Sequence, residues 1–432
     1  MIWNEEIECM QREDMRKIQD ERLIQLVERV YDNVPFYKSK MDAMGVKPSD
    51  IKSIDDIVKL PFTYKQDLRD NYPFGLFAAP KKDIVRIHAS SGTTGKPTTV
   101  GYTQNDIDNW KELVARCFTM AGVTSDDTAQ IAYGYGLFTG GMGAHYGAEH
   151  VGCSVIPISG GNTRRQLQLM NEFGSSMLAC TPSYALHLAD SMNDFGYSID
   201  DMKLRVGIFG AEPWTENMRL ELERKLNIEA YDIYGLSEIM GPGVSMDCEY
   251  HDGLHIHEDH FLAEIVDPET KLPVPHGEQG ELVFTTLTKE GIPLLRYNTR
   301  DLSTLMYDKC KCGRTLVRMK KITGRSDDML IIRGVNLFPS QIEHVLLELQ
   351  ETSAHYMLYL DRKNNLDTLE LQVELDSDRM IDTIRELQAL TKKIEHALSS
   401  ACGISIKVTL VQPKTIARSE GKAVRVIDRR NL

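Results

Sequence analysis

The sequence contains no run of eighteen apolar residues, so we expect no membrane-spanning helix. Its first residues, MIWNEEIECMQREDMRKIQ, lack the basic stretch and apolar core that are typical of a secretory signal. Eight cysteines in 432 residues do not make a disulfide framework, which together with the missing signal favours a reducing compartment. We therefore expect a cytoplasmic protein with no membrane partner.

Positive charge is also scarce, because 50 Lys and Arg residues face 63 Asp and Glu residues and the net charge is -13. Such a surplus of negative charge opposes binding to a polyanion, so we expect no nucleic-acid partner. Any phosphate would have to bind at a local loop. The apolar fraction of 42% is ordinary for a globular protein, and the length predicts two or more domains.

Between residues 83 and 240, short apolar runs alternate with amphipathic stretches. We predict buried strands at 129–135, 175–180, 205–210 and 228–235 and helices at 104–120, 164–173, 182–194 and 215–226. This alternation predicts an α/β domain in which helices cover a mixed or mostly parallel sheet. A strand-rich region is expected at 262–286 and 293–306.

The last hundred residues have a different pattern, which predicts a small α+β domain. Strands are expected at 328–333, 355–362, 367–376 and 404–411, and helices at 339–349 and 378–399. The polar junction Gly324-Arg325-Ser326-Asp327 separates two apolar runs. We therefore predict a large N-terminal domain over residues 1–326 and a small C-terminal domain over residues 327–432.

A loop rich in Ser, Thr and Gly lies between two strand-like segments and consists of Ser90, Ser91, Gly92, Thr93, Thr94, Gly95 and Lys96. Its backbone N–H groups, small hydroxyls and one ammonium suit a polyphosphate. It is not a Walker A loop, because the G-x-x-x-x-G-K spacing is missing and Pro97 follows the lysine. Taken alone, the segment has the alternative of a glycine-rich hairpin turn.

Four further motifs occur downstream. Tyr234-Gly235-Leu236-Ser237-Glu238 ends a predicted strand, where an aromatic ring can stack on a base and a carboxylate can hold Mg²⁺. In Tyr297–Asp301, the aspartate could accept hydrogen bonds from both ribose hydroxyls. The segments 324–328 and 420–425 complete the series. Each motif alone has an ordinary alternative, such as a turn with an exposed glutamate or a solvated basic tail.

Five motifs in this order resemble the adenylate-forming superfamily of acyl- and aryl-CoA synthetases, peptide-synthetase adenylation domains and luciferases, and the resemblance covers nearly the whole chain. Several phrases look closest to its phenylacetate–CoA ligase branch: AYGYGLFTGGMGAHYGAE, DGLHIHEDHF, GELVFTTLTKEGIPLLRYNTRDL, GRSDDMLIIRGVNLFPSQIE and RSEGKAVRVID. Arg300, which replaces the Gly of the wider superfamily's T-G-D motif, is another sign of this branch. The resemblance implies an AMP-forming ligase that uses ATP and Mg²⁺ to join an aryl acid, such as phenylacetate, to CoA through an acyl-adenylate.

The resemblance also implies roles for individual residues. Lys422 and Glu238 are expected to be catalytic, with Lys422 at the α-phosphate and substrate carboxylate, and Glu238 on Mg²⁺ with Thr94 as a second contact. The loop Ser90–Lys96 is expected to hold the β- and γ-phosphates. The expected nucleotide contacts are Gly210, Ala211, Glu212, Tyr234 and Gly235 around the adenine, and Asp301 and Arg325 on the ribose. Asp327 is expected to be the hinge of a mobile C-terminal domain, and Arg333 and Gly334 to line the CoA path.

The substrate pocket is expected on the segment that follows the strand at 129–135. Aromatic and small residues together can form a flat slot for a ring, and this segment offers Tyr135, Phe138, Gly141 and Ala144. Indole or hydroxyphenyl acids fit the same description. The alternative is that these residues simply pack in the core.

Three of the eight cysteines lie outside apolar sequence surroundings, whereas the other five are expected in the core. Cys310 and Cys312 form a C-x-C knuckle, and Cys248 precedes His251, His255 and His257. Three cysteines and one histidine make a closed structural zinc site. Members of the resembled family that have the knuckle also tend to carry the D-G-L-H phrase, which favours His255 over His251 as fourth ligand. The alternative is that these thiols are free.

Other functions stay open at this point. The enzyme could act on another aryl acid, such as indoleacetate or hydroxyphenylacetate, or could use a different acceptor. A non-catalytic nucleotide sensor is a further alternative, against which the intact Lys422 and Glu238 count. The resembled group is commonly homodimeric, so we expect a homodimer.

Overall fold

The computed structural model describes residues 1–90, 97–327, 329–332, 335–349, 351–363, 366–376, 383–418 and 423–430. The chain forms two compact units. The first contains Met1–Cys180, Asp200–Ala211 and Glu229–Lys321, and the second contains Thr181–Ile199, Glu212–Ile228 and Ile322–Leu432. Two central segments thus cluster with the C-terminal residues, and the domain boundary between residues 326 and 327 stays a prediction. Within the described ranges, no helix has the length and apolar character needed to cross a membrane.

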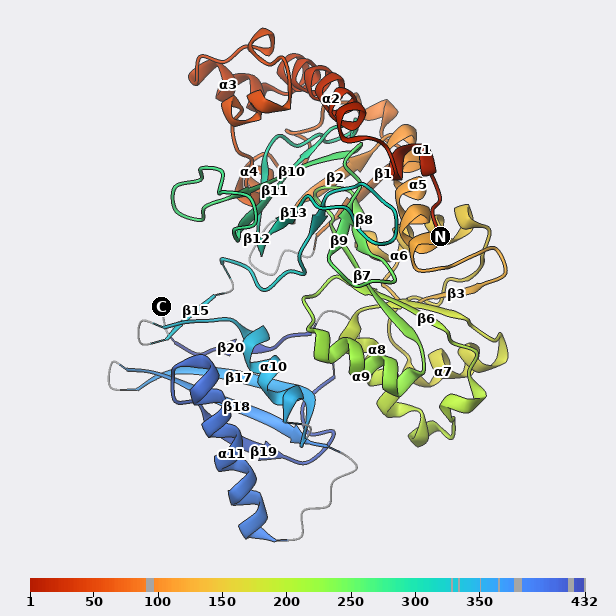
Figure 1. Cartoon of the computed structure of the whole chain (residues 1–432), viewed down its shortest axis with the longest axis vertical. Coiled ribbons are helices and arrows are strands. Elements are labelled where there is room, and N and C mark those ends of the chain that lie inside the picture. The colour runs from red at the N-terminus through yellow and green to blue at the C-terminus, as the bar shows by residue number, and fades with distance from the viewer. Residues whose placement is uncertain are drawn as a thin grey trace. The chain divides into compact units, whose positions relative to one another are not determined.

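The first unit is built on a nine-stranded sheet in the order β13-β14-β9-β8-β7-β6-β5-β3-β4 (Figure 1). Its parallel part comprises β3 (Thr128–Ile131), β4 (Ser154–Ile156), β5 (Met177–Cys180), β6 (Val206–Gly210) and β7 (Glu229–Leu236). Its antiparallel part comprises β8 (Gly241–Asp247), β9 (Leu254–Ile256), β13 (Leu305–Met306) and β14 (Arg318–Met319). The predicted mixed α/β class is confirmed.

Helices α5 (Gln104–Met120) and α6 (Thr139–Val151) pack on one another and on β8. α5 begins at a capping box in which Thr103 and Asp106 satisfy each other's backbone N–H groups. The two helices approach so closely that a Cβ on Gly147 would lie 2.2 Å from Cγ1 of Val114, so only glycine fits there. The other helices of this unit are α1 (Glu5–Glu8), α2 (Arg12–Asn33), α3 (Pro35–Ala43), α4 (Lys65–Asp70) and α7 (Thr163–Glu172).

Two smaller sheets of the first unit carry residues that matter for function. β1 (Arg86–Ala89) and β2 (Thr99–Tyr102) form an antiparallel pair in which Ala89 faces Thr99. This pairing places Ser90 and Thr98 opposite each other. The second sheet has the order β10-β11-β12, with β10 at Phe261–Val266, β11 at Gly280–Thr286 and β12 at Tyr297–Ser303.

The second unit contains a four-stranded sheet in the order β19-β18-β17-β20 (Figure 1). Its strands are β17 (Thr352–Lys363), β18 (Leu366–Leu375), β19 (Lys407–Val411) and β20 (Val426–Asp428), and a separate pair is formed by β15 (Leu330–Ile332) and β16 (Val335–Leu337). Its helices are α8 (Pro182–Ser191), α9 (Glu216–Leu226), α10 (Pro339–Glu348) and α11 (Ile384–Cys402). Ile342, Leu358, Leu371, Ile394 and Leu398 belong to one buried core that joins α10 and α11 to the sheet.

Some predicted boundaries differ from the structure. The strand expected at 129–135 ends at Ile131, whose partner on β5 is Ala179. The helix expected at 378–399 is seen from Ile384, where the Thr383 side chain accepts the N–H of Glu386, and residues 377–382 lie outside the described part.

Candidate active site and metal cluster

Glu238 is the centre of a polar cluster in the first unit. It follows β7, is 3% exposed, and accepts a hydrogen bond at Oε1 from the Thr98 hydroxyl at 3.2 Å. The Ser90 and Thr98 hydroxyl oxygens lie 2.5 Å apart, and the Ser90 N–H donates to the Thr98 carbonyl at 3.0 Å. The Lys65 ammonium lies 3.3 Å from the same carboxylate oxygen. The cluster thus joins the predicted magnesium ligand to Ser90, the first residue of the predicted phosphate loop, and to Thr98, two residues beyond its end. Residues 91–96 of the loop lie outside the described part.

A buried lysine fixes the backbone around Glu238. Lys289 is 1% exposed, and its ammonium donates to the carbonyls of Glu238 at 3.1 Å and Ile239 at 2.7 Å. Burial lowers the pKa of Lys289 to about 8, although the nearby Asp106 and Glu238 carboxylates oppose this shift. Asp106 in turn accepts the N–H groups of Glu290 and Gly291 and so holds the lysine's loop. Sequence reasoning missed Lys289, because it lies inside a family phrase and no spacing motif points to it.

Tyr234 and Asp301 meet between two sheets of the first unit. The Tyr234 hydroxyl donates to Oδ2 of Asp301 at 2.6 Å, and Asp301 is 5% exposed on β12. The preceding Arg300 has a φ of 67°, in the left-handed region that favours glycine. Glycine would adopt this backbone conformation with less strain than arginine does.

The predicted adenine segment runs from the end of β6. A Cβ on Gly210 would lie 2.1 Å from the Ile233 carbonyl oxygen, so the close approach of β7 requires glycine. Ala211 has a left-handed φ of 72°. The Glu212 carboxylate accepts the N–H of Ser183 at 2.8 Å through Oε1 and the N–H of Ala423 at 2.7 Å through Oε2. Glu212 therefore holds the residue that follows Lys422.

The second unit contains a cavity of about 500 Å³ that brings together three predicted site residues, Glu212, Arg325 and Asp327. The Arg325 guanidinium and the Asp327 carboxylate pair through Nε and Oδ1 at 2.9 Å. Glu343 and Arg425 also line this cavity. The predicted residues Arg333, Gly334 and Lys422 lie outside the described part, so the structure does not place them.

The predicted aryl residues lie at the start of α6. Gly141 and Ala144 are buried. A Cβ on Gly141 would lie 2.6 Å from the Gly134 carbonyl oxygen, so packing alone accounts for a glycine at this position. Phe138 is 41% exposed. The Tyr135 hydroxyl lies 3.2 Å from Nδ1 of His145, so this ring is held by a polar partner. Tyr135 and Phe138 are therefore the stronger candidates for substrate contact, and their role stays a prediction.

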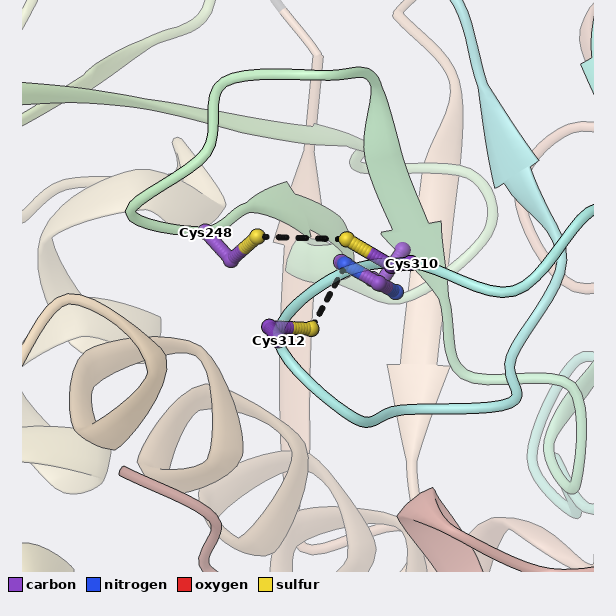
Figure 2. A group of neighbouring side chains, drawn as sticks. Cys248, Cys310 and Cys312 are labelled. Carbon is purple, nitrogen blue, oxygen red and sulfur yellow. Dashed lines mark hydrogen bonds between the residues drawn. The ribbon is translucent and has the colours of Figure 1, made fainter.

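The cysteine cluster is assembled from three segments of the first unit (Figure 2). Cys248 follows β8, His255 lies on β9, and Cys310 and Cys312 lie in the loop between β13 and β14. Their four ligand atoms all lie within 4.8 Å of one another. Cys248 and Cys310 are 3.7 Å apart at sulfur, and the Cys312 sulfur is 3.5 Å from Nε2 of His255. His251 instead contacts Asp247 at 2.8 Å, so it does not join the cluster.

The electrostatics of the cluster favour thiolates at Cys310 and Cys312, whereas hydrogen bonding with Cys312 and burial raise the pKa of Cys248. Hydrogen bonding from Cys248 lowers the pKa of Cys312 despite burial, and its contact with His255 lowers it further. The pKa of His255 is raised, because contacts with Cys310 and Cys312 outweigh burial. Three sulfurs and one imidazole nitrogen at this spacing are the donor set of a four-coordinate zinc site.

Comparison with known proteins gives matches over nearly the whole chain. Residues 12–287 match the family described as AMP-binding enzyme, and residues 334–430 match the AMP-binding enzyme C-terminal domain. The chain is 52% identical to the phenylacetate-coenzyme A ligase of Escherichia coli (strain K12), over 99% of this chain and 97% of that protein. It is 49% identical to the phenylacetate-coenzyme A ligase of Thermus thermophilus, over the full length of both.

A solved structure is similar as well. The crystal structure of 2-hydroxyisobutyryl-CoA ligase in complex with R3-HIB-AMP superposes with a TM-score of 0.92 at 29% identity. The match covers 98% of this chain and 91% of that one.

Proposed function

The chain belongs to the phenylacetate–CoA ligase family of AMP-binding enzymes, and we propose that it converts ATP, phenylacetate and CoA into phenylacetyl-CoA, AMP and diphosphate. Members of this family are AMP-forming acid–thiol ligases with ATP and CoA as substrates. The observation that carries the proposal is the contact of the Glu238 carboxylate with Thr98, and of Thr98 with Ser90. It supports a phosphate-binding role for the loop between Ser90 and Thr98.

The reaction divides into two displacements. A carboxylate oxygen of the acid bonds to the α-phosphorus of ATP, and the bond to the β-phosphate breaks with its electron pair leaving on diphosphate. The CoA sulfur then bonds to the carbonyl carbon of the acyl-adenylate, AMP departs with the electron pair of the broken C–O bond, and the thiol proton passes to solvent. The acid is already an anion at neutral pH, so positioning and positive charge matter more than acid–base catalysis.

The residues around Glu238 fit a magnesium ion. Mg²⁺ prefers oxygen ligands, and the site supplies a nearly buried carboxylate with the hydroxyls of Thr98 and Ser90 beside it. We assign Glu238 as the protein ligand of Mg²⁺, with Thr94 as a second contact. When bound, the ion neutralises phosphate charge. The loop Ser90–Lys96 would hold the outer phosphates through its N–H groups and Lys96.

The remaining roles follow the family pattern. Lys422 would contact the α-phosphate and the substrate carboxylate. Gly210, Ala211, Glu212, Tyr234 and Gly235 would form the adenine site, and Asp301 and Arg325 the ribose site. Asp327 would be the hinge between the two half-reactions, and Arg333 and Gly334 would line the CoA path. Tyr135, Phe138, Gly141 and Ala144 would wall the aryl pocket.

We further propose that Cys248, His255, Cys310 and Cys312 hold a structural zinc ion. Their four donor atoms leave no open coordination position, so the metal would fix the loop between β13 and β14 rather than do chemistry. We also propose that the protein is a homodimer and that it is located in the cytoplasm.

The test is diphosphate release with a panel of acids: phenylacetate, 4-hydroxyphenylacetate, indole-3-acetate and benzoate, each with and without CoA. We expect the highest kcat/KM with phenylacetate and thioester formation only with CoA. A higher kcat/KM with another acid would identify that acid as the substrate instead of phenylacetate. Diphosphate release without thioester formation would indicate a different acceptor, and no diphosphate release with any acid would favour a non-catalytic nucleotide-binding protein.

A further inference from the structure

Lys65 lies at the polar cluster although no sequence motif points to it. It is the first residue of α4, and its ammonium is 3.3 Å from Oε1 of Glu238. The Glu238 side chain is 4% exposed, whereas that of Lys65 is 41% exposed. A nearly buried carboxylate thus has a solvent-accessible cation beside it, next to the Thr98 hydroxyl that binds the same oxygen.

The backbone before Lys65 is tightly held. Thr63 donates its N–H to the Arg296 carbonyl at 3.1 Å, and its own carbonyl accepts the N–H of Asn298 at 3.0 Å. The buried Thr63 hydroxyl also donates to the Leu295 carbonyl at 2.6 Å. Asn298 lies on β12, the strand that carries Asp301. The base of the Lys65 side chain is therefore fixed relative to the predicted ribose ligand, while its end reaches the predicted magnesium ligand.

The two lysines near Glu238 differ in what they can do. Lys289 is fully enclosed and contacts two backbone carbonyls, so it can only hold the protein chain. Lys65 contacts a side-chain carboxylate from the solvent side. The Lys65 end of the pair is solvent-accessible, so its ammonium can leave Glu238 when Mg²⁺ takes its place at that nearly buried carboxylate. A lysine ammonium is a compact point charge that suits phosphate oxygens.

We propose that Lys65 is a phosphate-binding residue of the adenylation step, whose ammonium passes from Glu238 to an oxygen of the outer phosphates of ATP. This inference rests on the proposed function. When the bond between the α-phosphorus and the β-phosphate oxygen breaks, its electron pair leaves on diphosphate. A cation at the outer phosphates stabilises that charge. Lys65 would therefore bind the leaving group and not the AMP part of the nucleotide.

The test compares the dissociation constants of ATP, inorganic diphosphate and AMP, measured by titration calorimetry on the full-length protein and on Lys65→Met. We expect ATP and diphosphate to bind about 10- to 100-fold more weakly to the variant, the loss typical of one charge-assisted hydrogen bond. AMP binding should not change, and Lys65→Arg should recover most of the lost affinity. Equal weakening of all three ligands, or of none, would overturn the proposal.

Two controls separate this role from a purely structural one. The first is Lys59→Met, which removes an exposed ammonium paired with Asp56 at 2.7 Å and should leave all three constants unchanged. The second repeats the diphosphate titration in EDTA. We expect the loss in Lys65→Met to persist, because an ammonium contacts phosphate without a metal. A loss that vanishes in EDTA would mean that Lys65 acts through Glu238 and would refute direct phosphate binding. If the wild-type protein bound ATP but formed no thioester, the proposed function would be wrong, whereas the role of Lys65 in phosphate binding would still be tested by the titrations.

Discussion

The hydroxyl of Tyr234 lies 2.6 Å from Oδ2 of Asp301 and donates a hydrogen bond to it. Tyr234 is on β7 of the nine-stranded sheet, and Asp301 is on β12 of the three-stranded sheet. Two residues that are 67 positions apart in the sequence therefore share one contact. This contact orients the carboxylate that we assign to the ribose.

Tyr234→Phe removes this hydrogen bond and keeps the ring. We expect AMP and ATP to bind about tenfold more weakly, since a hydrogen bond to a carboxylate is worth about 1.5 kcal/mol or more. The measurement is the dissociation constant of each nucleotide. Tyr250→Phe, at an exposed tyrosine, is the control. Unchanged nucleotide affinity would show that the hydroxyl does not orient Asp301 for binding.

Lys289→Met should destabilise the protein as well as impair adenylation. The substitution leaves the buried carbonyls of Glu238 and Ile239 without their ammonium donor, at a cost of about 2 kcal/mol or more. We expect a lower free energy of unfolding in urea and weaker ATP binding. Lys111→Met, which removes a half-buried ammonium paired with an exposed carboxylate, should change stability by less than about 0.5 kcal/mol. An unchanged free energy of unfolding in Lys289→Met would contradict a stabilising role for its contacts with the Glu238 and Ile239 carbonyls.

Lys422→Ala should abolish acyl-adenylate formation, while supplied acyl-adenylate is still converted to thioester. Glu212→Ala should act in the same direction but more weakly, because its carboxylate holds the backbone N–H of the neighbouring Ala423. Both half-reactions are measured separately, by diphosphate release and by thioester formation from synthetic phenylacetyl-adenylate. Equal loss of both half-reactions in Lys422→Ala would overturn this division of labour.

Zinc removal should loosen the N-terminal segment. The loop that carries Cys310 and Cys312 continues into Arg314 and Thr315. Arg314 donates to the Glu8 carboxylate at 2.5 Å, and Thr315 donates its N–H to the Glu8 carbonyl at 3.0 Å. We expect about one zinc per chain by mass spectrometry, and faster hydrogen exchange over residues 1–10 in Cys312→Ser.

Cys153→Ser is the matched control for that experiment, because Cys153 is a buried thiol outside the cluster. It should retain zinc and normal exchange at the N-terminus. Less than half an equivalent of zinc in carefully purified wild-type protein would rule out the site.

The second unit should lose stability in acid. His355 and Asp190 lie 2.9 Å apart, and burial lowers the pKa of His355. Burial opposes ionisation of Asp190, but hydrogen bonding to His355 and the charge of Lys225 bring its pKa down to about 2. Both pKa values are lower in the folded state, so the unfolded chain binds more protons as the pH falls. The histidine's contribution is present above about pH 6.5 and is lost below it, and that of Asp190 is lost from about pH 3.9 downward.

Thermal unfolding between pH 7 and pH 5 measures the histidine's part of this effect. We expect the wild-type midpoint to fall over that range and His355→Gln to show a smaller decrease. His344→Gln, at a more exposed histidine, should follow the wild-type curve. A wild-type midpoint that is constant from pH 7 to pH 5 would contradict the assigned shift.

The sequence alone was sufficient for the family, the α/β class and the positions of many strands along the chain, because apolar periodicity and short motifs are local properties of the chain. The expectation of an aryl-acid CoA ligase family is confirmed by relatives at about half identity over nearly the full length. The three cysteines also stood out by spacing alone, whereas the choice of His255 over His251 followed the resemblance.

Only the tertiary structure brought Lys65, Thr98, Asp106 and Lys289 to the surroundings of Glu238. Each lies in a different segment and outside the five motifs, and its role depends on backbone carbonyls and side chains that long-range folding places beside it. Likewise, the contact of Tyr234 with Asp301 depends on how two sheets meet, which no local pattern encodes. Local sequence patterns thus determined the secondary-structure elements and the family, and long-range packing determined which charged side chains face one another.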